Sequence, residues 1–150
     1  MRVMTQFSIF LVNKPGVLAQ VMAALAKQKV NVIALTLMDS SEHGVLRVVC
    51  EDADAARSAL AGSHDRFTET EVLALELTNE PGDFARAAEK LAAAHINITY
   101  AYCTGGAPGG KTTAIFKVAD LKKALRILRP AKSARKEPRQ AVRAAPGRRR

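Results

Sequence analysis

Residues 11–19 read LVNKPGVLA, and residues 77–85 read LTNEPGDFA. The two stretches lie 66 positions apart, and the similarity continues beyond them at the same spacing. A window of 22 residues holds eight identities, where average residue usage gives roughly one or two by chance. The identical pairs are Leu11/Leu77, Asn13/Asn79, Pro15/Pro81, Gly16/Gly82, Ala19/Ala85, Leu25/Leu91, Ala26/Ala92 and Asn31/Asn97. Such a period predicts two copies of one supersecondary unit, called here the first and second copy.

The hydrophobic pattern around each repeat predicts the element order βαββαβ. Alternating apolar residues predict a strand over Phe7–Val12, which Pro15 and Gly16 end before an amphipathic helix. The elements expected next in the first copy are strands Val30–Met38 and Val45–Cys50, helix Ala53–Leu60 and an edge strand Arg66–Thr70. Those expected in the second copy are strand Val72–Leu77, helix Pro81–His95, strands Asn97–Thr104 and Thr113–Val118, and helix Asp120–Leu128.

No strand pattern follows Leu128, so the second copy is expected to lack its last strand and to expose an open sheet edge. The order βαββαβ is that of the ferredoxin-like sandwich, an α+β fold with an antiparallel sheet and helices on one face. The expected organisation is one module over 1–70, a second over 71–128 and a tail over 129–150.

The net charge of +9 is concentrated in the tail. Residues 129–150 hold nine Lys and Arg against one Glu, whereas residues 1–128 hold 14 basic and 13 acidic side chains. The near-neutral folded part argues against a nucleic-acid-binding face, and the composition of the tail predicts disorder. The tail could still bind nucleic acid through counterion release. A solubilising extension is favoured, because the tail has no aromatic residue on which bases could stack.

Residues Gly105–Thr112 match the phosphate-binding pattern GxxxxGK[ST]. A P-loop requires a helix directly after the glycines, so that the start of the helix holds the phosphates. The segment that follows is β-branched and is the third strand of the second copy by the repeat. The residues Asp52, Ala56 and Leu60 match Asp120, Ala124 and Leu128 at a spacing of 68, so this hairpin is two residues longer. We therefore interpret the motif as a hairpin loop.

The remaining reactive side chains form no recognisable catalytic or metal-binding set. Cys50 and Cys103 lack metal-ligand spacing and are interpreted as small hydrophobic strand residues in a reducing compartment. His43, His64 and His95 share no spacing typical of a metal site. No segment is apolar over the ~18 residues that a membrane span requires, and Phe7–Val12 is too short for a signal peptide. The expectation is a cytoplasmic, non-enzymatic protein without cofactor, metal or membrane association.

The repeated turn itself suggests binding of an anion. A strand end, a Pro-Gly turn and a helix start place unpaired backbone N–H groups side by side, and the helix N-terminus favours a carboxylate. Pro15 fits the first helical turn, and Gly16 permits close approach of another group. Asn13 and Asn79 can both donate and accept hydrogen bonds beside the turn.

The pattern Asn-x-Pro-Gly-x-(Leu/Phe)-Ala, followed after about 11 residues by (Val/Ile)-Asn-(Val/Ile), resembles the ACT domain. ACT domains are small regulatory modules that bind amino acids, and the layout is similar to small stand-alone tandem ACT proteins. The resemblance spans about residues 5–128. It implies a ligand held between two adjacent modules, with contacts from Asn13, Gly16, Asn31, Asn79, Gly82 and Asn97. Val17, Leu18 and Phe84 are the expected neighbours of the ligand side chain.

The two copies differ beside the turn. Lys14 is replaced by Glu80, and Val17 by Asp83. An acidic residue at a helix N-terminus competes with an incoming carboxylate. The sequence thus predicts unequal sites, with the turn at Asn13 the better carboxylate acceptor and Asp83 better placed for an ammonium group.

Three functional hypotheses remain from the sequence. The first is a non-catalytic amino-acid sensor that forms a homodimer. The second is a regulatory subunit of a separate amino-acid biosynthetic enzyme, similar to the small subunit of acetolactate synthase. The third is nucleic-acid association through the tail.

Overall fold

The computed structural model describes residues 1–38, 43–63 and 66–129. Their hydrogen-bonded strands form a six-stranded, fully antiparallel sheet in the order β2-β3-β1-β4-β6-β5. The strands are β1 (Arg2–Val12), β2 (Val32–Met38), β3 (His43–Cys50), β4 (Phe67–Thr78), β5 (Ile98–Cys103) and β6 (Lys111–Val118). The helices are α1 (Val17–Lys27), α2 (Ala53–Gly62), α3 (Asp83–Ala93) and α4 (Leu121–Leu128). The predicted α+β fold of two ferredoxin-like units is confirmed.

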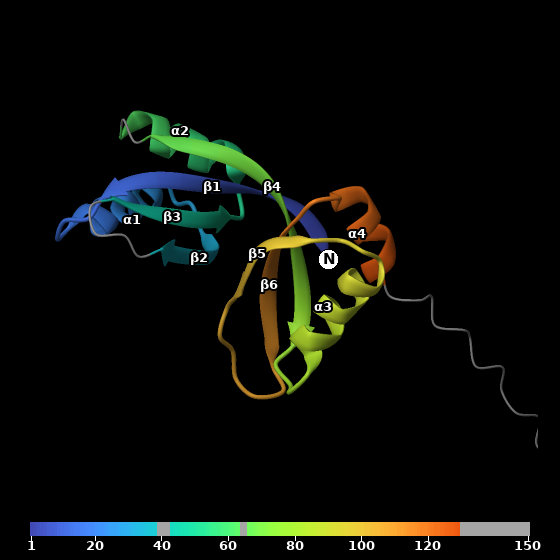
Figure 1. Cartoon of the computed structure of the whole chain (residues 1–150). Helices are drawn as coiled ribbons and strands as arrows, with labels where there is room; N and C mark the ends of the chain where they lie inside the picture. The colour runs from blue at the N-terminus through green and yellow to red at the C-terminus, as the bar shows by residue number, and fades with distance from the viewer. Residues whose placement is uncertain (39–42, 64–65, 130–150) are drawn as a thin grey trace, which may run out of the picture.

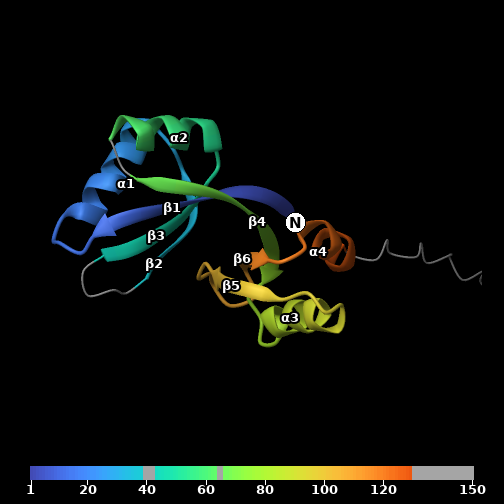
Figure 2. The same ribbon diagram turned by 45° about the horizontal axis from the view of Figure 1, so that its top comes forward.

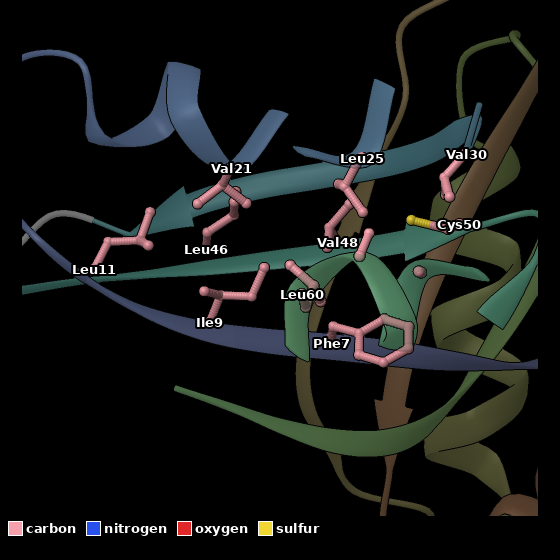
Figure 3. Close-up of a cluster of buried hydrophobic side chains, with 12 residues drawn as sticks. Phe7, Ile9, Leu11, Val21, Leu25, Val30, Leu46, Val48, Cys50 and Leu60 are labelled. Atoms are coloured by element: carbon pink, nitrogen blue, oxygen red, sulfur yellow. The ribbon is translucent and has the colours of Figure 1, made fainter. Parts of the chain in front are cut away.

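Each pair of helices covers one half of the sheet (Figure 1). Helices α1 and α2 pack over the half that contains β1 and β3, and α3 and α4 over the half that contains β4 and β6. Figure 3 shows the core of the first copy, where Phe7, Ile9 and Leu11 of β1 pack in one cluster with Val21 and Leu25 of α1 and Leu60 of α2. Alternate residues of a strand face opposite sides of a sheet, which explains why the apolar period of two in β1 builds this core.

The repeat predicts local backbone detail as well as elements. Asp52 and Asp120 each cap a helix, and each side chain accepts a hydrogen bond from the backbone N–H three residues later. Lys29 and His95, which differ in sequence, both have positive φ, at 57° and 53°. Strand β6 begins at Lys111, which confirms the spacing of 68 and the two extra residues in the hairpin before it.

Two predictions about the strands are wrong. The edge strand Arg66–Thr70 and the strand Val72–Leu77 are one continuous strand, β4, so the expected module boundary between residues 70 and 71 lies inside it. The second copy also has no open edge at its missing strand, because the first residues of β1 fill that place. Arg2, Val3 and Met4 pair with Ala74, Leu73 and Val72.

On the face of the sheet that no helix covers, residues of the two copies pack against each other. An apolar cluster there joins Ala34 of β2, Val49 of β3 and Ile115 of β6, which belong to different copies. Gln6 of β1 is fully buried beside this cluster, and its side chain bonds to the hydroxyls of Tyr100 and Tyr102 in β5. The two copies therefore share strands, a polar network and a small core of their own.

Candidate functional site

The two repeated turns have the same backbone geometry. Gly16 and Gly82 precede α1 and α3 with φ of 87° and 89°, in the left-handed region that side chains with a Cβ rarely adopt. A Cβ on Gly16 would meet nothing within 4 Å. The backbone conformation is therefore what requires glycine at this position, and the space beside it is open to an approaching group. Pro15 also precedes the helix and does not occupy its first turn.

A cavity of about 260 Å³ opens beside the first turn and is called here the first cavity. It lies where β1 ends, α1 begins, β2 ends and β3 begins. Its lining residues are Leu11, Val12, Asn13, Lys14, Val17, Leu18, Leu37, Met38 and Gly44. Apolar side chains thus surround one amide and one ammonium group, as in a site for a small ligand with a polar end.

A second cavity lies beside the second turn, and its volume is only about 90 Å³. Its lining residues are Leu77, Thr78, Asn79, Glu80, Asp83, Phe84, Cys103, Thr104 and Thr112. Each is the repeat partner of one residue of the first cavity, at a spacing of 66 or, after the longer hairpin, 68. The fold thus builds the same site twice from different side chains.

Hydrogen bonds within the chain engage the polar groups of the second cavity. The amide of Asn79 donates to the carbonyl oxygens of Gly106, at 2.7 Å, and Ala107, at 3.1 Å. One carboxylate oxygen of Asp83 accepts from the backbone N–H of Thr78 at 2.8 Å and from the Thr78 hydroxyl. The other oxygen pairs with the Arg86 guanidinium.

These contacts change the electrostatics of the second turn. The Thr78 hydroxyl, and next the Arg86 guanidinium, hold the pKa of the Asp83 carboxyl below its ordinary value. Asp83 is therefore a charged group whose two oxygens already have partners inside the chain. The prediction that it is better placed for a ligand ammonium is not supported by this geometry.

The ten residues predicted for the site fall into three groups. Asn13, Val17 and Leu18 line the first cavity. Asn79, Asp83 and Phe84 line the second. Gly16 and Gly82 shape the turns without lining either cavity, and Asn31 and Asn97 precede β2 and β5 without lining either one.

The exposed side chains of Asn31 and Asn97 lie at the other end of these strands, and their carbonyl oxygens accept from the N–H groups of Glu51 and Ala119. Sequence reasoning missed the contribution of the hairpin side of each cavity, namely Leu37, Met38 and Gly44 in the first copy. Aligning the copies at both spacings would have paired these residues with Cys103, Thr104 and Thr112.

The turns before α1 and α3, beside which the two cavities lie, are far apart in the fold (Figures 1 and 2). Strands β1 and β4 run antiparallel, with Ile9 beside Phe67 and Arg2 beside Ala74, so their carboxyl ends point apart. A single chain therefore does not bring the two Asn-x-Pro-Gly turns together.

The apparent P-loop is a hairpin connection. Lys111 begins strand β6, so no helix follows the glycines, as the repeat predicts. The described part of the chain holds no cluster of three or more His, Cys, Asp or Glu side chains that could bind a metal, and His64 lies outside it. Cys50 is buried in β3, where desolvation raises its thiol pKa to about 11. Cys103 lies in strand β5, as the repeat predicts, and it is exposed there.

None of the helices in the described ranges is both long enough and apolar enough to cross a bilayer. The tail beyond Arg129 lies outside the described residues. The prediction that the tail is disordered therefore stays a prediction.

Comparison with known protein families identifies the pair of repeats. A family model described as an ACT domain pair matches residues 1–133. The chain belongs to the ACT-domain family. ACT domains are regulatory, amino-acid-binding modules rather than catalytic ones, and the two copies are a tandem ACT pair.

Solved structures show the same arrangement. Protein BT0572 from Bacteroides thetaiotaomicron is 31% identical, with a TM-score of 0.77 over 84% of this chain and 86% of that one. A regulatory subunit of aspartate kinase from Thermus thermophilus shares the fold at 16% identity, with a TM-score of 0.62 over 85% and 95%. The corresponding subunit from Thermus flavus gives 19% identity and a TM-score of 0.56 over 76% and 82%. A search of curated proteins finds no match.

Proposed function

We propose that this tandem ACT protein is a non-catalytic sensor that binds a free amino acid in the first cavity. The observation that carries the proposal is an open, mostly apolar cavity of about 260 Å³ at the N-terminus of α1. Helix α1 has no acidic residue in its first turn, so its positive end is not compensated there. A ligand carboxylate is the natural anion for that place.

The walls of the cavity favour an amino acid with an apolar side chain. Leu11, Leu18 and Leu37 supply hydrocarbon surface, while Asn13 contributes an amide and Lys14 a positive charge to the lining. A zwitterion can therefore place its carboxylate at the turn and its side chain against the leucines. Burying that side chain gives affinity, and the polar groups fix its orientation.

A thermal-shift screen of the twenty amino acids tests this proposal. A ligand at 100 times its dissociation constant is expected to add about 2.7 kcal/mol to the free energy of unfolding. Asn13→Ala is expected to weaken binding, measured by calorimetry, more than the repeat-matched control Asn79→Ala. No shift with any amino acid would contradict the proposed sensor, and equal losses would contradict the choice of cavity.

We further propose that a second copy of the chain covers the first cavity. The two turns of one chain lie apart, so a ligand held between modules requires a neighbouring chain. Strand β2 lies at the edge of the sheet, and its Leu35, Leu37 and Met38 are 45%, 48% and 46% exposed. In the second copy the same positions are Ala101, Cys103 and Thr104. An apolar edge that adjoins an open cavity suits a homodimer.

Replacing Leu35 with lysine is expected to shift the protein toward monomer, because an exposed charge on an edge strand opposes pairing. Ala101→Lys, at the same repeat position in β5, is the matched control and is expected to leave the dimer intact. Light scattering coupled to size-exclusion chromatography measures both. A monomeric wild type, or equal dissociation by both variants, would contradict pairing through β2.

A second candidate function is control of a separate biosynthetic enzyme. The chain covers 95% of a Thermus thermophilus chain that is itself a regulatory subunit of aspartate kinase. Affinity purification that recovers an enzyme in stoichiometric amount would favour this candidate over a free-standing sensor.

A further inference from the structure

We propose that the second cavity is occupied by the chain's own Asp83 carboxylate, so that the pair Val17/Asp83 decides which turn binds ligand. Each chain then binds one amino acid rather than two. This inference rests on the proposed function and specifies the stoichiometry and the selecting residue of that site.

The surroundings of Asp83 are those that a ligand carboxylate would require. Its oxygens contact the Thr78 backbone N–H at 2.8 Å, the Thr78 hydroxyl and the Arg86 guanidinium at 2.5 Å. Backbone N–H groups, hydroxyls and guanidinium groups are the donors that proteins use to bind carboxylates. The side chain of Asp83 is only 19% exposed, in keeping with a group held inside the site.

The first copy has no such internal carboxylate. Val17 stands in the place of Asp83, Val12 in that of Thr78 and Gln20 in that of Arg86. The first turn of α1 has no acidic residue, whereas that of α3 has Asp83. The first cavity, which has no internal carboxylate, is also the larger of the two, with about 260 Å³ against about 90 Å³.

The longer hairpin engages Asn79, the amide that lines the second cavity. The carbonyl oxygens of Gly106 and Ala107 hold the Asn79 amide, and both residues belong to the connection that contains the two extra residues. A Cβ on Gly106 would lie 2.7 Å from the Lys111 carbonyl oxygen, so this close packing of the hairpin requires glycine.

Phe84 also lines this cavity, and its ring stacks on that of Phe116 with 5.1 Å between the ring centroids. A covalently attached carboxylate has a high effective concentration, so a free amino acid would have to displace it against that advantage. The second cavity is therefore self-occupied.

Reciprocal exchange of the two residues tests the inference. The probe is the amino acid that gives the largest shift in the screen, and calorimetry of the full chain measures stoichiometry and affinity. We expect one site per wild-type chain and two per chain in Asp83→Val. We expect Val17→Asp to weaken binding in the first cavity at least ~tenfold, because an attached carboxylate then occupies the helix N-terminus. Val17→Asn, of matched size without charge, is expected to weaken it less.

A readout without ligand separates this inference from the proposed function. In the wild type, the Thr78 amide resonance is expected to shift with pH as the Asp83 carboxyl is protonated, and in Asp83→Val this shift is expected to vanish. If the Thr78 amide shifts with pH in the wild type and not in Asp83→Val, but no amino acid binds, the proposed function fails and the occupancy of the second cavity by Asp83 stands. Two sites in the wild type, one site in Asp83→Val, or equal effects of the two Val17 variants would overturn the inference.

Discussion

Replacing Leu25 with alanine is expected to lower the free energy of unfolding by about 2–5 kcal/mol, and replacing its repeat partner Leu91 by a similar amount. Both side chains are fully buried, that of Leu25 on the inner face of α1 and that of Leu91 on the inner face of α3. Truncation removes buried methyl groups and leaves a cavity that the surrounding helices fill only in part. Chemical denaturation followed by circular dichroism measures the loss.

The same two variants test whether the copies unfold together. Strands β1 and β4 pair along residues that belong to both halves, from Ile9 with Phe67 to Arg2 with Ala74. Either truncation is therefore expected to shift one cooperative transition. Gln20→Ala, at an exposed position of α1, is the control and is expected to change stability by no more than about 0.5 kcal/mol. Two separate transitions, each shifted by one variant alone, would show that the copies are independent.

Replacing Gln6 with alanine is expected to lower the free energy of unfolding by about 1–3 kcal/mol, because buried polar groups that lose their partners keep their desolvation penalty. Gln6 is fully buried in β1. Its amide nitrogen donates to the Tyr100 hydroxyl at 2.7 Å and to Ser8 at 3.2 Å, and its oxygen accepts from the Tyr102 hydroxyl at 2.9 Å. The Arg47 guanidinium stacks over the Tyr100 ring, 4.1 Å from its centroid.

A combined variant separates lost hydrogen bonds from lost packing. Burial raises the pKa of the Tyr102 hydroxyl, so that group stays protonated and needs an acceptor. Gln6→Leu together with Tyr100→Phe and Tyr102→Phe removes both sides of the network and fills the space, which is expected to recover most of the stability. Urea denaturation measures all variants. A loss below about 0.5 kcal/mol in Gln6→Ala would contradict a structural role for the network.

The paired copies were predictable because local signals repeat. The Asn-x-Pro-Gly turns, the helix caps at Asp52 and Asp120, and the strand after the glycine-rich hairpin all depend on neighbouring residues. The single sheet was not predictable in the same way. Residues 2–6 read RVMTQ and lack a clean apolar alternation, because β1 pairs with both copies and Gln6 is buried by distant tyrosines.

For the candidate site, too, some features follow from the sequence and others only from contacts between distant residues. The exchange of Val17 for Asp83 is visible in the aligned repeats, and it predicts unequal turns from the charge at a helix N-terminus. Whether each cavity is open depends on contacts between distant segments. Asn79 meets Gly106 across 27 positions of the chain, and Phe84 stacks on Phe116.

By itself, the sequence determined the repeated unit, its turns and the residue types placed at them, because these follow from local backbone chemistry and hydrophobic period. Only the tertiary structure decided that two modules share one sheet and that their cavities lie far apart. It also decided that Thr78 binds the Asp83 carboxylate beside the smaller cavity. The physical reason is that strand pairing and side-chain packing join residues that no local pattern links.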